Sequence, residues 1–223
     1  MLTGAPIIGA LVGLHHRSTN TKTGQMIQAY VLRDDIDPIT AVNTGQDDAI
    51  CGTCPMRSGS NEGRACYVIW WLGPNQTWKA SRSYPVVPPA LASTHLVGRS
   101  VRITAYGDAA AIPFDTWAQL VGRASHHTGY TSQWATCDPR FKLLLMASVQ
   151  TPAQQAQAAA AGWRTFRSGW QRADPQIEVQ CPASAEMGHR TVCTDCALCQ
   201  GARLQAKSVA IQPHGMRTQW MPV

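Results

Sequence analysis

Two groups of closely spaced cysteines constrain this chain of 223 residues more than any other feature. The first cysteine cluster consists of Cys51, Cys54 and Cys66, and the second cysteine cluster consists of Cys181, Cys193, Cys196 and Cys199. The packing of an ordinary apolar core does not gather thiols in this way, whereas metal sites and redox sites do. We therefore expect the fold to bring each group of thiols together.

Composition and charge indicate an ordered protein without a membrane span. Hydrophobic residues make up 44% of the chain, and the apolar run at residues 5–14 is shorter than the ~20 residues of a spanning helix. No Lys or Arg precedes that run, as a signal peptide would require. We expect a cytoplasmic location, where a reducing environment favours metal ligands over disulfides. The net charge of +6 permits an anionic partner without requiring one.

The second cysteine cluster supplies enough thiols for one complete metal site. Cys181 precedes Pro182 directly, and after eleven further residues three cysteines follow at two-residue spacing. Structural zinc sites usually pair two Cys-x-x-Cys motifs, whereas three cysteines in this spacing plus a Cys-Pro are similar to ferredoxin loops, although here the Cys-Pro comes first. The spacing favours a [4Fe–4S] cluster, with zinc, and metal-free thiols or a disulfide, as the alternatives.

The first cysteine cluster leaves one position of a four-coordinate site open. A vacant position can bind and activate an external ligand, whereas a closed four-thiolate site is usually structural or redox. The alternative is a structural site completed from elsewhere in the chain. Candidates for that fourth ligand are His95, Cys137, Asp47 and Asp48.

From about residue 99 the pattern alternates between strands and helices. We expect strands at residues 25–32, 101–106, 128–134, 143–149, 163–167 and 208–211, and helices at residues 39–44, 113–124 and 152–161. Such alternation predicts a parallel sheet with right-handed crossovers. Three or four units cannot close an eight-fold barrel. The predicted fold class is α/β, a partial (open) parallel β/α barrel or an open sheet, with two cysteine-rich metal-binding loops.

The expected organisation is a flexible N-terminal lead at residues 1–24 and a single α/β domain at residues 25–223, with the cysteine clusters at 51–66 and 181–199. Ligands of such folds bind at the carboxyl ends of the strands. Gly107 and Asp108 follow one strand and are candidate cofactor-binding residues, although a turn capped by Asp108 is an equal alternative. Other predicted strand-end residues are Gln133, Ser148, Gln150, Arg167, Gln212 and His214.

Residues 163–172 interleave tryptophan and phenylalanine with arginine. Aromatic rings flanked by guanidinium groups suit single-stranded nucleic acid, in which each stacked base contributes ~1–3 kcal/mol. Alternation of side chains along a half-buried strand produces the same string of residues. Nucleic acid is therefore a candidate partner, and a half-buried strand without such a partner is the alternative.

Several segments resemble a family of uncharacterised bacteriophage and prophage proteins. They are residues 50–54, VRITAYGDAAAIP at 101–113, TGYTSQW at 128–134, the stretch that ends in GWRTFR at 162–167, and CPAS and CTDCALCQG within residues 181–201. More distantly, a cysteine cluster that ends in Cys66 and Tyr67 ahead of a partial α/β barrel is similar to radical S-adenosylmethionine enzymes. Their usual cysteine spacings are three and two residues, whereas this chain has two and eleven.

The distant resemblance implies that the first cysteine cluster holds a cubane whose fourth iron binds S-adenosylmethionine, and that the second cysteine cluster holds an auxiliary cluster. It also places Gly107 and Asp108 near the cofactor or substrate, and it assigns no catalytic residue. The expected function is that of an iron–sulfur phage protein in the bacterial host cytoplasm, acting as a radical enzyme on nucleic acid or nucleotides. The alternatives are a non-enzymatic, zinc-stabilised nucleic-acid-binding or adaptor protein and, less favoured, a plain electron-transfer protein.

Overall fold

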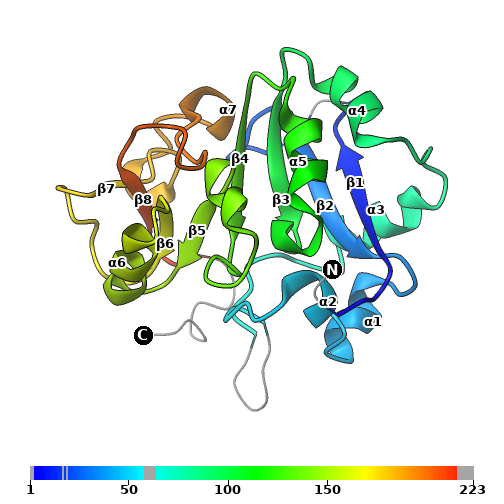
Figure 1. Ribbon diagram of the computed structural model, residues 1–223, viewed down its shortest axis with the longest axis horizontal. Coiled ribbons are helices and arrows are strands. Elements are labelled where there is room, and N and C mark those ends of the chain that lie inside the picture. The colour runs from blue at the N-terminus through cyan, green and yellow to red at the C-terminus, as the bar shows by residue number, and fades with distance from the viewer. Residues whose placement is uncertain (1–2, 17, 19, 58–63, 215–223) are drawn as a thin grey trace. The chain divides into compact units, whose positions relative to one another are not determined.

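The structure of the protein is a computed structural model that describes residues 3–16, 18, 20–57 and 64–214. Eight strands form an open, mostly parallel β-sheet that does not close into a barrel (Figure 1). This result confirms the α/β class and its open-sheet form. The chain divides into two compact units, the first at 1–19, 25–52 and 68–127 and the second at 20–24, 53–67 and 128–223.

The first unit contains three adjacent strands. β1 (Ile7–Val12) pairs antiparallel with β2 (Ile27–Arg33), and β2 pairs parallel with β3 (Ser100–Tyr106). The fully buried side chains of these strands, such as Leu32 and Ile103, form the centre of its core. The helices of this unit are α1 (Pro38–Asn43), α2 (Asp48–Cys51), α3 (Gly73–Ser81), α4 (Pro89–Ala92) and α5 (Phe114–Val121), and its 3₁₀ helices are η1 (Ser93–Leu96) and η2 (Ala109–Ala111).

The second unit carries parallel strands in the order β4-β5-β6-β8-β7. The strands are β4 (His126–Thr131, which the second unit includes from Thr128), β5 (Met146–Val149), β6 (Thr165–Ser168), β7 (Glu178–Gln180) and β8 (Ser208–Ile211). Its helices are α6 (Pro152–Ala160) and α7 (Cys193–Cys196), with η3 (Pro139–Leu143) and η4 (Ala185–Met187) as 3₁₀ helices. Figure 1 shows α6 beside β5 and β6.

The helix expected at residues 152–161 forms as α6. Thr151 Oγ1 accepts a hydrogen bond from Gln154 N, and Gln154 Oε1 accepts one from Thr151 N, which completes a capping box before Pro152. The strand expected at 143–149 begins only at Met146. Pro139 and the Asp138 cap start a 3₁₀ helix that takes up the first part of this apolar run.

The N-terminal residues include a strand and a turn. β1 forms a complete antiparallel ladder with β2, which the sequence analysis did not anticipate because the strand lies among glycines. Further along, Asn20 Oδ1 accepts hydrogen bonds from Lys22 N and Thr23 N and folds residues 20–24 into a turn of the second unit. The flexible lead expected at residues 1–24 stays a prediction.

A buried ion pair links β6 to β7. Arg167 donates to Glu178 through Nε and Nη2, at 2.9 and 2.7 Å, and the two side chains are 2% and 3% exposed. Arg167 also donates to the carbonyls of Gln171 and Arg172. All the guanidinium nitrogens of Arg167 are therefore engaged inside the unit.

We expect Glu178→Gln to lower the free energy of unfolding by about 3–5 kcal/mol, because it leaves the Arg167 charge buried without its counter-charge. The control is Arg140→Gln, which removes the exposed pair that Arg140 forms with Asp138. It should lower the free energy of unfolding far less, because solvent screens an exposed ion pair. Urea unfolding of both variants measures the difference. Equal losses would contradict the assignment.

Candidate metal centre

The second cysteine cluster is assembled by three local structures of the second unit. Cys181 follows β7 directly, and its N–H donates to Ala210 O of β8 at 2.8 Å. Cys193 and Cys196 are the first and last residues of α7, which ends at Ala197 in the left-handed conformation at φ 52°. This reversal turns the chain back toward the sheet. Cys199 then lies against β4, where Gly129 N donates to its carbonyl at 3.1 Å.

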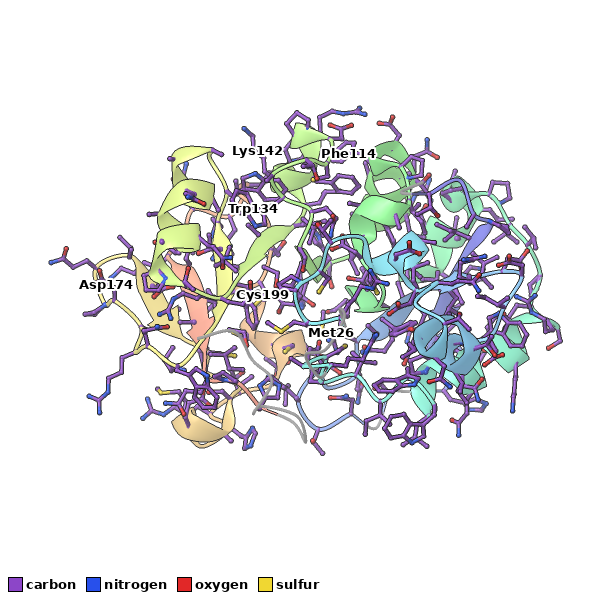
Figure 2. All side chains as sticks on the ribbon, turned by 90° about the horizontal axis from the view of Figure 1, so that it is seen from below. Met26, Phe114, Trp134, Lys142, Asp174 and Cys199 are labelled. Carbon is purple, nitrogen blue, oxygen red and sulfur yellow. The ribbon has the colours of Figure 1, made fainter. Side chains whose placement is uncertain are left out.

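Two of the four thiols lie inside an apolar core. Cys181 and Cys199 are 5% and 7% exposed and belong to one cluster of buried side chains with Met146, Val209 and Ile211. Cys193 packs against the same cluster, and Figure 2 labels Cys199 among the side chains of this unit. The sheet thus fixes Cys181 and Cys199, while α7 carries the two more exposed thiols.

The electrostatics show that the four thiols are neighbours. The pKa of Cys199 is raised to about 12, mainly by burial; a hydrogen bond with Tyr130 opposes this rise, and the nearby Cys181, Cys193 and Cys196 contribute to it. Burial also raises the pKa of Cys181, against the opposing effect of Lys22. Each thiolate would therefore repel the others unless a cation or a proton lies among them.

Residues 20–24 hold α7 in place, a contact that the sequence analysis did not identify. Cys193 N donates to Lys22 O at 2.9 Å, and Thr194 Oγ1 donates to Thr23 O at 2.7 Å. Gly24 adopts φ +63°, and a Cβ there would lie 2.7 Å from Thr194 Oγ1. The Asn-x-x-x-Gly pattern at 20–24 signals a turn, but nothing local in it indicates which element the turn would contact.

The thiols of the second cysteine cluster are neighbours but do not surround a common metal position. Among the described residues, which include all eight cysteines, no three His, Cys, Asp or Glu side chains are placed to hold a metal ion. No disulfide joins any of these cysteines. The donor set of the second cysteine cluster suits a metal chemically, but its side chains would have to rotate inward around an ion or cluster.

The first cysteine cluster is divided between the two units. Cys51 ends α2 in the first unit, whereas Cys54 and Cys66 belong to the second. Within the second unit, Cys66 N donates to Met56 O at 2.8 Å, which brings the segments on either side of residues 58–63 together. A site formed by all three thiols stays a prediction. Of its candidate fourth ligands, Cys137 lies in the second unit, and Asp47, Asp48 and His95 lie in the first.

The segments around Cys54 and Cys66 lie at the carboxyl ends of parallel strands. Gln133, after β4, accepts at Oε1 from Thr53 N and Oγ1, at 3.3 and 3.0 Å. The Tyr67 ring lies 5.5 Å from that of His214, which follows β8. The carboxyl edge of the sheet is where ligands of open α/β folds bind.

A third residue at this edge has an unused hydrogen-bonding group. Gln150 follows β5 and is 3% exposed, and its side-chain nitrogen has no hydrogen-bond partner among the described residues. A buried amide without a partner is unusual in a native structure. Of the other predicted strand-end residues, Gln212 follows β8 and donates through its N–H to Glu186, Arg167 lies within β6 in the ion pair with Glu178, and Ser148 lies within β5.

Gly107 and Asp108 form a tight turn after β3. Gly107 has φ +79°, and Asp108 N donates to Ile50 O at 2.6 Å. Asp108 Oδ1 accepts from Ala110 N at 2.9 Å and caps η2. The capping alternative of the sequence analysis is therefore present, and a cofactor-binding role for Gly107 and Asp108 stays a prediction.

The arginines expected to contact nucleic acid face inward instead. Arg164 and Arg167 are 8% and 1% exposed, and both donate to acceptors within the second unit. Arg167 lies on the buried face of β6 with Thr165, and Arg164 directly precedes the strand. Trp170, Gln171 and Arg172 are the exposed residues of this stretch.

Comparison of the chain with protein-family models, with curated proteins and with solved structures gave no match. No helix in the part of the chain that the structure describes combines the length and apolar character needed to cross a membrane.

We expect Gly107→Ala to lower the free energy of unfolding by about 2–4 kcal/mol, because it adds left-handed strain to overpacking. Its Cβ would lie 2.7 Å from Val31 O and 2.8 Å from Val31 Cβ. Gly45→Ala is the matched control, since Gly45 has φ +73° with nothing within 4 Å of the new Cβ. It should cost only ~1–2 kcal/mol. Chemical denaturation of both variants measures the difference, and equal costs would contradict the close approach to Val31.

We expect the Cys199 thiol of the folded, metal-free protein to resist alkylation at pH 8. A pKa of about 12 leaves about 10⁻⁴ of this thiol ionised at that pH, whereas an unperturbed thiol with a pKa of ~8.5 is about one quarter ionised. Mass spectrometry after iodoacetamide treatment should show alkylation about 10³-fold slower in the folded than in the urea-unfolded protein. Similar rates in the two states would contradict the burial of Cys199.

Proposed function

We propose that the protein binds a [4Fe–4S] cluster through Cys181, Cys193, Cys196 and Cys199. One observation carries the proposal: segments separated along the chain bring Cys181, Cys193 and Cys196 within electrostatic range of Cys199, which is buried in an apolar cluster. Four thiolates are the usual ligand set of a cubane. The approach of these thiols from the end of β7, from α7 and from the loop before β8 supports a single centre.

The choice of a cubane over zinc rests on the spacing of the cysteines. Four thiolates suit either occupant. The three cysteines at two-residue spacing favour the cubane, whereas structural zinc sites usually pair two Cys-x-x-Cys motifs.

The local charge also suits such a cluster. A cubane bound by four thiolates is an anion, and Lys22 lies close enough to Cys181 to favour the thiolate form. The N–H of Ala183 donates to the Cys181 sulfur and acts in the same direction. Hydrogen bonds and positive charge around the sulfurs stabilise an anionic centre and tune its potential.

We further propose that the first cysteine cluster forms an open site for a reacting ligand. The contacts of Thr53 with Gln133 and of Tyr67 with His214 place its segments at the carboxyl ends of β4 and β8. This position favours an enzyme over a plain electron carrier. The proposed enzyme is a phage protein in the host cytoplasm, with S-adenosylmethionine as a cofactor and nucleic acid or nucleotides as substrates, and these points rest on the resemblance alone.

The alternative is a non-enzymatic, zinc-stabilised nucleic-acid-binding or adaptor protein. In such proteins metal-binding energy is folding energy, and the thiols of both clusters would only order their loops. The inward orientation of Arg164 and Arg167 removes two of the arginines on which nucleic-acid binding would depend. Metal analysis distinguishes this alternative directly.

We expect anaerobically purified protein to be brown and to contain iron and acid-labile sulfide. Cys196→Ser should lose the iron of one cubane and melt at a lower temperature, because a centre that links β7, α7 and β8 stabilises the fold when bound. Cys137→Ser is the control for the second cysteine cluster, since Cys137 lies in the same unit outside that cluster and its replacement should leave the iron of that cluster unchanged. Cys54→Ser should affect only the iron of the first cysteine cluster.

Iron, sulfide and zinc contents, visible spectra and thermal unfolding are measured on the wild type and the three variants. Colourless protein with stoichiometric zinc would contradict the cubane and support the zinc-stabilised alternative. Metal content and melting temperature unaffected by Cys196→Ser would contradict a metal centre in the second cysteine cluster.

A further inference from the structure

Arg164 occupies an unusual position just before β6. It is 8% exposed, and its guanidinium donates to four backbone carbonyls of the chain between α7 and β8. The acceptors are Leu198 O at 2.9 Å and Gln200 O at 2.6 Å from Nη1, Ala206 O at 2.9 Å from Nε and Lys207 O at 2.6 Å from Nη2.

These acceptors bracket one of the proposed ligands. Leu198 and Gln200 are the residues on either side of Cys199, so Arg164 fixes the peptide groups that orient this thiol. A guanidinium presents five N–H donors in a rigid planar fork and can hold several carbonyls at once. A lysine ammonium has the same charge but lacks the fork.

The charge of Arg164 is the second observation. Arg167, three residues further along, is also buried, and it is neutralised by Glu178. None of the four acceptors of Arg164 is a carboxylate, although a buried cation is costly without a counter-charge. Burial lowers the pKa of Arg164, and the nearby Cys199 acts in the opposite direction. A thiolate at Cys199 would supply the counter-charge that these carbonyls lack.

We infer that Arg164 is the positioning residue and buried counter-charge of the second cysteine cluster. It holds Cys199 ready to bind and offsets the negative charge that the thiolates carry around a metal. This inference rests on the proposed metal centre. It explains both why the guanidinium contacts only carbonyls and why it lies beside thiols instead of a carboxylate.

The test uses cobalt(II) as the probe, because the intensity of sulfur-to-cobalt charge-transfer absorption increases with the number of bound thiolates. Cobalt is titrated into reduced, metal-free full-length protein in which Cys54 and Cys66 are replaced by serine, so that only the second cysteine cluster is reported. Arg164→Met removes both fork and charge, and Arg164→Lys removes the fork alone. Arg167→Lys is the matched control, and Cys199→Ser gives the three-thiolate reference.

We expect Arg164→Met to bind cobalt about 10–100-fold more weakly than the parent and to give the charge-transfer intensity of Cys199→Ser. Arg164→Lys should show a smaller loss of affinity, since the charge remains. Arg167→Lys should keep the parent intensity and affinity even though it destabilises the fold. Circular dichroism establishes whether each variant is folded. If Arg164→Met does not fold, the comparison of Arg164→Lys with the parent tests the role of Arg164.

Different results would contradict the proposed metal centre and the role of Arg164. If the parent protein shows no sulfur-to-cobalt absorption, the proposed metal centre is wrong. If the parent binds cobalt with four thiolates and both Arg164 variants match it in intensity and affinity, the metal centre stands and the role of Arg164 is overturned. The role of Arg164 is also overturned if Arg167→Lys reduces intensity and affinity as much as Arg164→Lys does.

Discussion

The cost of burying charge without a partner governs the second unit. Arg167 meets this constraint through Glu178, with which it forms a bidentate ion pair. Arg164 donates to four carbonyls, and a thiolate at the neighbouring Cys199 would supply its counter-charge. Cys199, buried in an apolar core, remains neutral as a thiol and becomes favourable as a thiolate only beside a cation. The same constraint thus explains the ion pair, the carbonyl contacts and the chemistry that the thiols can support.

Parallel topology then determines where chemistry can occur. The strands of the second unit run in one direction, so the chain leaves each of them at the same edge of the sheet. Gln133, Gln150 and His214 lie in these exits, and the segments around Cys54 and Cys66 contact two of them. The second cysteine cluster starts from the end of β7. An open sheet therefore presents the segments around Cys54, Cys66 and Cys181 at its carboxyl edge without forming a barrel.

The sequence predicted those elements whose signals are local. The apolar run of β5, the helix α6 and the placement of β6 and β8 were all expected from local patterns. β7 has only three residues and was missed, since so short a segment carries no periodic pattern. The sequence did not show that Arg164 and Arg167 are buried, because the strands of a parallel sheet are covered on both faces by elements that a local pattern does not reveal.

By itself, the sequence determined that thiols occur at the spacing of metal ligands. It also determined the pattern of helices and strands, through helix caps and apolar runs. Only the tertiary structure decided which distant residues serve those thiols. Lys22 and Thr23 hold α7, and Arg164 holds the loop of Cys199, across separations of at least 34 residues. Such contacts depend on how strands pack and on where buried charge can be balanced, and neither condition leaves a local pattern in the sequence.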